Sequence, residues 1–382
     1  MKEINLLIPG PMPLPPEVRA AMSAPMINHR GEDFSRMLGT VLRGLQTVFQ
    51  VSGPVLPIVA SGTGGLEAAI VNVLSPGDRV LALSCGLFGD RFAMIAEAFG
   101  ANVIKVEADW GRTIDPALVT DALRQHRGVK AVLLTHNETS TGVTNPLQAI
   151  AEAVRSTDAL LVVDAVSSAG AIDIRADAWG LDVVVTGSQK ALMGPPGMAF
   201  VSVSPRAWEA IKTSRMPKHY FSFEHARTQL TAAGPFTPFT PALPVIYALE
   251  VSIAMILREG LAARFAHHQH LARATRTGVK ALGLELFPHL SGASDTVTAV
   301  RMPEGLDVKD LLRRLRTDHH VILAGGQGRL DGKIVRIGHM GYVQNQQIMA
   351  ALEALEHVLP HFGHPVRPGT AAGAAAAILK AP

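Results

Sequence analysis

Two short stretches decide the fold of this chain: LLVVD at residues 160–164 and VVVTGSQK at residues 183–190. Each begins as a run of apolar residues that does not alternate with polar ones, which is typical of a strand buried on both faces of a sheet. Each ends in polar residues, Asp164 in the first stretch and Lys190 in the second. Because the carboxyl ends of parallel strands meet at one edge of a sheet, we expect these two side chains to lie close together.

The same pattern extends outward along the chain. Apolar runs predict strands at residues 55–60, 79–84, 102–107, 130–136, 159–165, 182–188 and 199–204. Helix-length segments lie between them, including residues 66–74, 88–99 and 116–126. Strands that alternate with helices indicate an α/β fold with a mostly parallel, doubly wound sheet of seven strands.

A second unit begins near residue 260. Residues 296–302, 321–324 and 334–337 predict strands, and residues 308–317 and 346–358 predict amphipathic helices. We therefore expect a large domain with an N-terminal arm (1–258), a smaller α+β domain (259–362) and a flexible tail (363–382). The tail is rich in Ala, Gly and Pro, which predicts a frayed end or a loosely held helix.

Composition places the chain among globular proteins and excludes several classes. Of the 382 residues, 48% are hydrophobic and 18% are charged. A net charge of +3 without runs of Lys or Arg indicates no nucleic-acid partner. No apolar stretch reaches the roughly 20 residues that span a bilayer, and no targeting signal is recognised, so we expect a cytoplasmic protein. The single cysteine, Cys85, excludes an intrachain disulfide and a Cys-rich metal site.

A glycine-rich segment, SGTGG at residues 61–65, follows the first predicted strand and precedes a helix. Glycines let the backbone approach an anion closely, and the N–H groups at the start of a helix favour a phosphate. The segment has neither the Lys of a Walker loop nor the Gly-x-Gly-x-x-Gly spacing of a dinucleotide site. Taken alone, it indicates either a phosphate site or a turn capped by Ser61.

The charged residues at the strand ends allow two interpretations each. A buried carboxylate needs a partner, so Asp164 either caps a backbone turn or pairs with a protonated heterocyclic nitrogen. Lysines are usually solvated, but Lys190 follows the buried run at 183–185, and desolvation there lowers the pKa of its amine and makes it nucleophilic toward a carbonyl. Arg336 lies between Val335 and Ile337, so it is either a core arginine in a salt bridge or a two-point clamp for a carboxylate.

Together these features are a phosphate cradle, an acid for a ring nitrogen, an amine for an aldehyde and a guanidinium for a carboxylate. Pyridoxal 5'-phosphate (PLP) requires the first three groups, and an amino-acid substrate requires the fourth. The combination therefore predicts a PLP enzyme in which Lys190 holds the cofactor as a Schiff base, with no metal.

Longer motifs carry a family resemblance. They run from IPGPMPLP at 8–15 and HRG at 29–31, through THNETSTG at 135–142, VDAVSS at 163–168, GSQKAL at 187–192 and PPG at 195–197, to GHMG at 338–341. With these motifs the chain resembles the class V aminotransferases of PLP fold type I, and among them the alanine–glyoxylate and serine–glyoxylate enzymes. The resemblance covers nearly the whole chain except the tail.

The resemblance implies cofactor roles for particular residues. Asp164 and Lys190 would be catalytic, with Asp164 at the pyridine nitrogen and Lys190 bound to the aldehyde. The other cofactor-binding residues would be Ser61, Gly62, Thr63 and Gln189 at the phosphate, Phe88 and Val166 on the two ring faces, and Thr139 beside the ring. Eukaryotic relatives usually have Trp where this chain has Phe88, and a plain core aromatic is the alternative for that residue.

The resemblance also implies substrate and subunit contacts. Arg336 and Gly10 would bind the substrate. Thr240 would reach the phosphate from a neighbouring subunit, which implies a homodimer with a shared active site. Some relatives have Tyr where this chain has Thr237, so the role of Thr237 is open.

The implied reaction is transamination of alanine or serine with glyoxylate or pyruvate. Lys190 would act as general base and acid at Cα. Ureidoglycine is an alternative donor. A lyase or cysteine desulfurase on the same fold is a rival, but the second half of the chain has no cysteine. A non-catalytic subunit is disfavoured, because it would have no reason to keep a buried Lys near a buried Asp.

Overall fold

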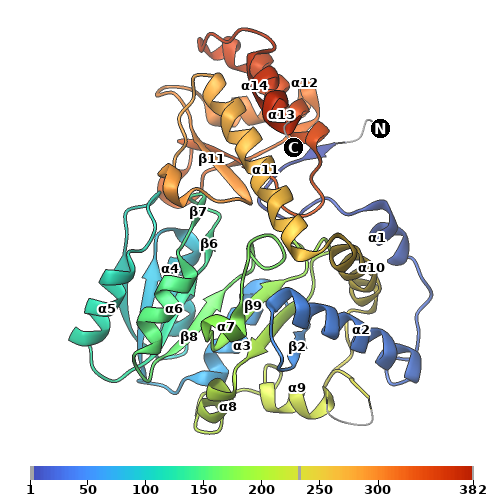
Figure 1. The fold of residues 1–382 in the computed structure, drawn as a ribbon, viewed down its shortest axis with the longest axis vertical. Coiled ribbons are helices and arrows are strands. Elements are labelled where there is room, and N and C mark those ends of the chain that lie inside the picture. Colours follow the sequence, from blue (N-terminus) through green and yellow to red (C-terminus); the bar gives the residue numbers. More distant parts are fainter. Residues whose placement is uncertain (1–3, 231–233, 381–382) are drawn as a thin grey trace.

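The computed structural model describes residues 4–230 and 234–380, so the ends of the predicted domain ranges at 1–3 and 381–382 lie outside the described residues. Figure 1 shows two lobes, a larger one built around a long sheet and a smaller one at the top. Between them run the N-terminal arm and helix α11 (Leu261–Ala281).

A seven-stranded sheet forms the centre of the larger lobe, as predicted. Its strand order is β2-β10-β9-β8-β5-β3-β4, and only β10 runs antiparallel to its neighbours. The strands are β2 (Val55–Ile58), β3 (Arg79–Ser84), β4 (Asn102–Glu107), β5 (Val129–Thr135), β8 (Leu160–Asp164), β9 (Val183–Gly187) and β10 (Ala199–Val203).

Both faces of most of this sheet are buried, which explains why most of its strands are continuously apolar; the edge strand β4 is partly exposed and carries Lys105. In β8, Leu161 and Val163 belong to one core cluster, whereas Leu160 and Val162 belong to the other. Helices cover the two faces: α2 (Glu32–Phe49), α3 (Gly62–Val73), α4 (Leu87–Ala98), α5 (Pro116–Gln125), α6 (Leu147–Arg155), α7 (Ala176–Trp179), α8 (Pro205–Ile211), α9 (Phe223–Leu230) and α10 (Leu243–Glu259).

The smaller lobe combines an antiparallel sheet with helices. The sheet has the order β11 (Val297–Arg301), β14 (Ile334–Gly338), β13 (Ala324–Gly325). Helices α12 (Val308–His319) and α13 (Asn345–Val358) pack with α11. The predicted strand at 321–324 is divided into β12 (Val321–Ile322) and β13.

The arm and the tail both contact the smaller lobe. Strand β1 (Asn5–Leu6) of the arm pairs with β12. The tail contains helix α14 (Thr370–Leu379), which packs on α11 with Ala371 and Ala375 fully buried. Small alanine side chains allow this close packing of helices. A boundary between the two domains at 258/259 stays a prediction.

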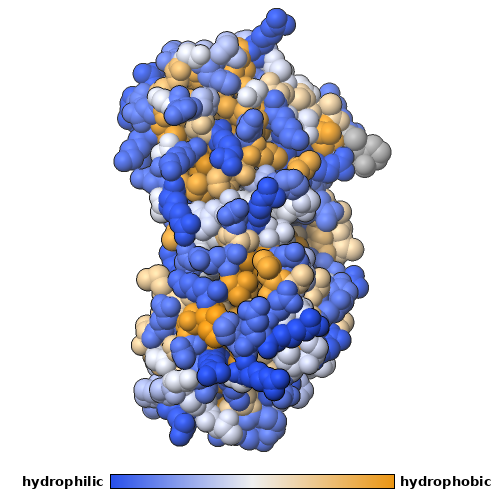
Figure 2. Space-filling view, turned by 90° about the vertical axis from the view of Figure 1, so that its left-hand side faces the viewer, coloured by the Kyte–Doolittle hydropathy of each residue, from blue (hydrophilic) through white to orange (hydrophobic). Residues whose placement is uncertain are grey.

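None of the helices in the described part of the chain is long and apolar enough to cross a bilayer. On the face drawn in Figure 2, hydrophilic side chains cover much of both lobes, and hydrophobic side chains form patches on each lobe.

Candidate active site

Three neighbouring strands of the large sheet end at the candidate site. β5, β8 and β9 lie side by side, and they end at Thr135, Asp164 and Gly187. Thr135 is in register with Asp164, and Asp164 with Val185. Lys190 follows β9 by three residues. The fold therefore brings Asp164 and Lys190 to the same edge of the sheet.

Asp164 is buried, with 5% of its surface exposed. Its Oδ1 accepts a hydrogen bond from the backbone N–H of Val166 (2.9 Å), and its Oδ2 accepts one from Oγ1 of Thr135 (3.3 Å). Burial raises the pKa of Asp164 to about 6, and the charge of Lys190 is among the influences that lower it. Asp164 thus caps a backbone turn in the structure. Each of its carboxylate oxygens keeps a further lone pair for a ligand.

Lys190 lies beneath the N-terminal arm. Its Nζ donates to the carbonyl oxygen of Pro9. Burial lowers the pKa of Lys190 to about 8, Asp164 opposes that shift, and Arg336 adds to it. Gly10 has a φ of 108°, and a Cβ there would lie 2.5 Å from Nζ of Lys190. The arm can pass this close to the amine only because residue 10 has no side chain.

The residues that were predicted to hold a phosphate gather at the start of α3. Oγ of Ser61 caps the helix by accepting from the N–H of Gly64 (3.4 Å). Ser61 and Thr63 are exposed, whereas Gly62 is buried, and a Cβ at Gly62 would lie 2.6 Å from Cγ2 of Val166.

The side-chain amide of Gln189 lies at the same end of α3. Its Oε1 is buried without a hydrogen-bond partner in the structure. A Cβ built on Gly187 would lie 2.9 Å from that oxygen and 3.6 Å from the backbone nitrogen of Gly62. The amide of Gln189 therefore lies beside the N-terminus of α3.

Arg336 enters the site from β14 of the smaller lobe and is 5% exposed. Its Nε donates to the carbonyl oxygen of Gly325 (2.9 Å) and its Nη1 to that of Thr139 (3.1 Å). Burial lowers the pKa of Arg336 to about 10, and the charge of Glu138 opposes this. Across the described residues, no carboxylate lies within ion-pair distance of its guanidinium. The core salt bridge that was the alternative interpretation is absent from that part of the chain.

Glu138 is a buried residue of this region that the sequence interpretation left without a role. It is fully buried, and its carboxylate accepts from the backbone N–H of Phe88 (2.9 Å) and of Gly89 (3.0 Å). Phe88 itself is half-buried, with the guanidinium of Arg91 4.9 Å from its ring centroid. The signal for Glu138 was present in the THNETSTG motif, but its partners in α4 lie about 50 residues earlier in the sequence.

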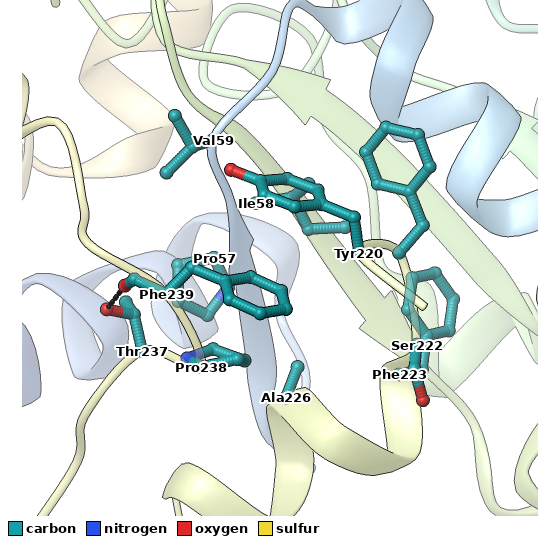
Figure 3. A pocket seen from close by; sticks show the side chains of 11 residues that line it. Pro57, Ile58, Val59, Tyr220, Ser222, Phe223, Ala226, Thr237, Pro238 and Phe239 are labelled. Atoms are coloured by element: carbon teal, nitrogen blue, oxygen red, sulfur yellow. Dashed lines mark hydrogen bonds between the residues drawn. The ribbon is translucent and has the colours of Figure 1, made fainter. Parts of the chain in front are cut away.

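Thr237 and Thr240 belong to a separate region at the edge strand β2. The hydroxyl of Thr237 donates to the carbonyl oxygen of Phe239 (2.6 Å; dashed in Figure 3), and Thr240 is exposed. Figure 3 shows an apolar pocket here, in which the ring of Tyr220 stacks on that of Phe239 with centroids 4.7 Å apart. Its lining is Pro57, Ile58, Val59, Tyr220, Phe221, Ser222, Phe223, Ala226, Thr237, Pro238 and Phe239.

The residues at the sheet edge fit PLP. The amine of Lys190 has a lowered pKa and only a carbonyl as its hydrogen-bond partner in the structure. The amide of Gln189 has no partner for its oxygen and lies at a helix N-terminus, so a rotated amide can donate its N–H2 to a phosphate in this favourable place. Asp164 and Arg336 supply an anion and a cation at the same edge, so each group that the cofactor and an amino acid require is present.

The chain belongs to the class V aminotransferases. Residues 19–347 match the family model described as Aminotransferase class-V. Members of this family are PLP-dependent transaminases of fold type I, so this protein is a PLP-dependent transaminase with that fold.

Individual relatives cover nearly the whole chain. One is the soluble hydrogenase small subunit of Synechococcus sp., 44% identical over 98% of this chain and 98% of the relative. Another is the L-aspartate–glyoxylate aminotransferase of Paracoccus denitrificans, 38% identical over 97% and 94%. Among solved structures, the ureidoglycine–glyoxylate aminotransferase of Bacillus subtilis superimposes with a TM-score of 0.95 at 32% identity, covering 100% and 99%.

Proposed function

We propose that this protein transfers the amino group of alanine or serine to glyoxylate or pyruvate, with Lys190 and Asp164 as its catalytic residues. The observation that carries the substrate class is Arg336, a buried cation without a carboxylate partner among the described residues, at the same edge as Lys190. A free carboxylate is common to every amino-acid donor and 2-oxo-acid acceptor. Its binding would complete the coordination of the guanidinium.

The residues of this chain would divide the work as follows. Ser61, Gly62, Thr63 and Gln189 would hold the phosphate, Val166 and Phe88 would pack on the ring, and Thr139 would lie beside it. Asp164 would keep the ring nitrogen protonated, and Lys190 would hold the aldehyde carbon. PLP, when bound, supplies an electron sink for the negative charge that develops at the substrate Cα.

Proton transfer falls to Lys190. A lysine with a pKa of about 8 is partly neutral near pH 7. Its amine can therefore accept the Cα proton as a base and then release that proton as an acid. Arg336 holds the substrate carboxylate, which fixes the Cα–H bond relative to that amine. Because residue 10 is a glycine, the arm can lie directly over the same amine.

Ureidoglycine is the second candidate donor. The Bacillus subtilis structure named for ureidoglycine and glyoxylate superimposes over the whole chain, and the Paracoccus relative is named for aspartate and glyoxylate. Both names share glyoxylate as acceptor, which supports glyoxylate as an acceptor for this chain.

We also propose a cytoplasmic homodimer in which Thr240 contacts the phosphate of the partner subunit's site. Thr240 is exposed next to an aromatic pocket at the sheet edge, where Tyr220 is also exposed, and aromatic residues are enriched in subunit contacts. Sedimentation of the holoenzyme tests this, because a monomeric active enzyme contradicts it.

A half-reaction screen tests the donor. Each of alanine, serine, aspartate and ureidoglycine is added to the PLP-loaded protein, and the absorbance of the bound cofactor is followed. We expect alanine or serine to give the fastest conversion. A conversion confined to ureidoglycine would establish the second candidate, and no conversion with any of them would contradict transamination of these donors.

A further inference from the structure

The start of helix α4 is capped by side chains from another part of the chain. Its own N-cap residue, Gly86, makes no side-chain hydrogen bond. The N–H of Leu87 donates to Oγ of Ser140 (2.9 Å), and those of Phe88 and Gly89 donate to Oε2 of Glu138. A side chain at residue 86 would collide with Glu138, so glycine makes room for this cap. The position of Phe88 therefore depends on the carboxylate of Glu138.

The second oxygen of Glu138 fixes the backbone of its own turn. Oε1 accepts from the N–H of Ser140 (3.1 Å) and from its Oγ (2.6 Å). Thr139 lies between these two residues, and its carbonyl oxygen receives Nη1 of Arg336. The carboxylate of Glu138 thus fixes the backbone at Thr139, whose carbonyl oxygen orients the guanidinium of Arg336. Glu138 accepts four hydrogen bonds in all, two at each oxygen.

Charge adds to this connection. Burial raises the pKa of Glu138, and the four hydrogen bonds oppose the shift. The carboxylate also lies at the positive end of the α4 dipole, which favours its charged form. In that form, Glu138 acts on Arg336 in the direction that keeps the guanidinium protonated.

We propose that Glu138 is a positioning residue of the transamination site, which fixes Phe88 on the ring side and Arg336 on the substrate side relative to each other. The inference rests on the proposed function, because Phe88 and Arg336 matter together only if a ring and a carboxylate bind between them. Glu138 need not touch either ligand. It acts through the backbone at residues 88–89 and through the carbonyl of Thr139.

Glu138→Gln is the sharpest test. Gln has the same shape, but its amide N–H2 would face N–H and O–H donors instead of accepting from them, and buried donors would lose their acceptor. The matched control is Glu356→Gln. Glu356 is also a buried carboxylate at a helix start, where it accepts from Gly369, Ala371 and Ala372 of the α14 segment, and it lies in the smaller lobe.

The readouts are the induced circular dichroism of bound PLP, the dissociation constant of PLP, and the dissociation constant of propionate, a monocarboxylate without an amine. For Glu138→Gln we expect a weaker dichroism band and about tenfold weaker binding of both PLP and propionate, as the loss of buried hydrogen bonds predicts. For Glu356→Gln we expect a lower melting temperature with all three readouts as in the wild type.

The proposal is overturned if Glu138→Gln melts earlier but keeps the wild-type dichroism and both affinities, as the control does. If Glu138→Gln does not fold, Ser140→Ala removes one donor to Glu138 and the cap of Leu87, and it should change the same readouts in the same direction; unchanged values overturn the proposal. Failure of the wild-type protein to bind PLP would instead contradict the proposed function.

Discussion

Two buried arginines of the chain differ in the groups that their guanidiniums contact. Arg264 in α11 is satisfied within the protein: its Nη1 pairs with Glu259 (2.9 Å), while Nε and Nη2 donate to the carbonyl oxygens of Gly170 and Ala191. Arg336 in β14 is also buried, but among the described residues its guanidinium donates only to carbonyl oxygens. A buried cation that is paired with its own carboxylate is already neutralised, whereas one without a carboxylate among the described residues is suited to bind one from outside.

Two lysines differ in the same way, and the largest expected loss of turnover comes from replacing the one at the candidate site. Lys190→Ala should lower turnover by about four orders of magnitude, because the amine both holds the cofactor and moves the proton. PLP should still bind without a covalent link. Lys212→Ala, which removes an exposed lysine paired with Glu209, is the control and should keep wild-type turnover. Turnover assays of both variants at saturating PLP check this.

Two buried aspartates give the next comparison. Asp164→Asn keeps the shape but removes the charge at the ring nitrogen, and should slow Cα–H cleavage by about a hundredfold. Asp182 is as buried at the opposite end of the sheet, where it accepts from Leu161 and pairs with Arg206. Asp182→Asn should lower the melting temperature without slowing cleavage. A deuterium isotope effect on the half-reaction measures the step, and near-normal cleavage in Asp164→Asn would show a structural role only.

The arginine pair itself predicts a smaller and separable effect. Arg336→Lys keeps the charge but loses the planar fork, so KM for donor and acceptor should rise together by about 10- to 100-fold with little change in stability. Arg264→Lys should cost about 2 kcal/mol of unfolding free energy with both KM values unchanged. Melting curves and steady-state kinetics of the two variants decide. Reversed results would mean that Arg336 is the structural arginine.

The smallest effect is a shift along the pH axis. Only the neutral amine reacts with an aldehyde, so covalent attachment of PLP to the apoprotein should speed up with pH and level off near pH 8, the pKa of Lys190. An ordinary lysine would continue to gain up to about pH 10.4. Asp164 raises that pKa, so Asp164→Asn should level off at a lower pH. Initial rates of attachment across pH 6 to 10, at saturating PLP, measure both profiles.

The sequence predicted the large sheet well because its strands carry a local signal. Continuous apolar runs such as the one before Asp164 mark a strand buried on both faces, and the polar residue that follows marks the functional edge. The cofactor class followed from the residues at those edges. Element ends differed by one or a few residues.

Other features depend on contacts between distant segments and could not be read locally. The pairing of β1 with β12 brings the arm over Lys190, and no pattern within the arm indicates that partner. The packing of α14 on α11 depends on small residues whose composition also fits a frayed end. Whether Arg336 has a salt bridge, and that Glu138 caps α4, depend on which carboxylate lies nearby in space.

The most direct measurement of the central claim is peptide mapping after borohydride reduction of the PLP-loaded protein. Reduction makes the link between cofactor and amine permanent, and digestion then locates it. We expect a single labelled peptide that contains Lys190, with the label lost in Lys190→Ala. A label on any other lysine would contradict it.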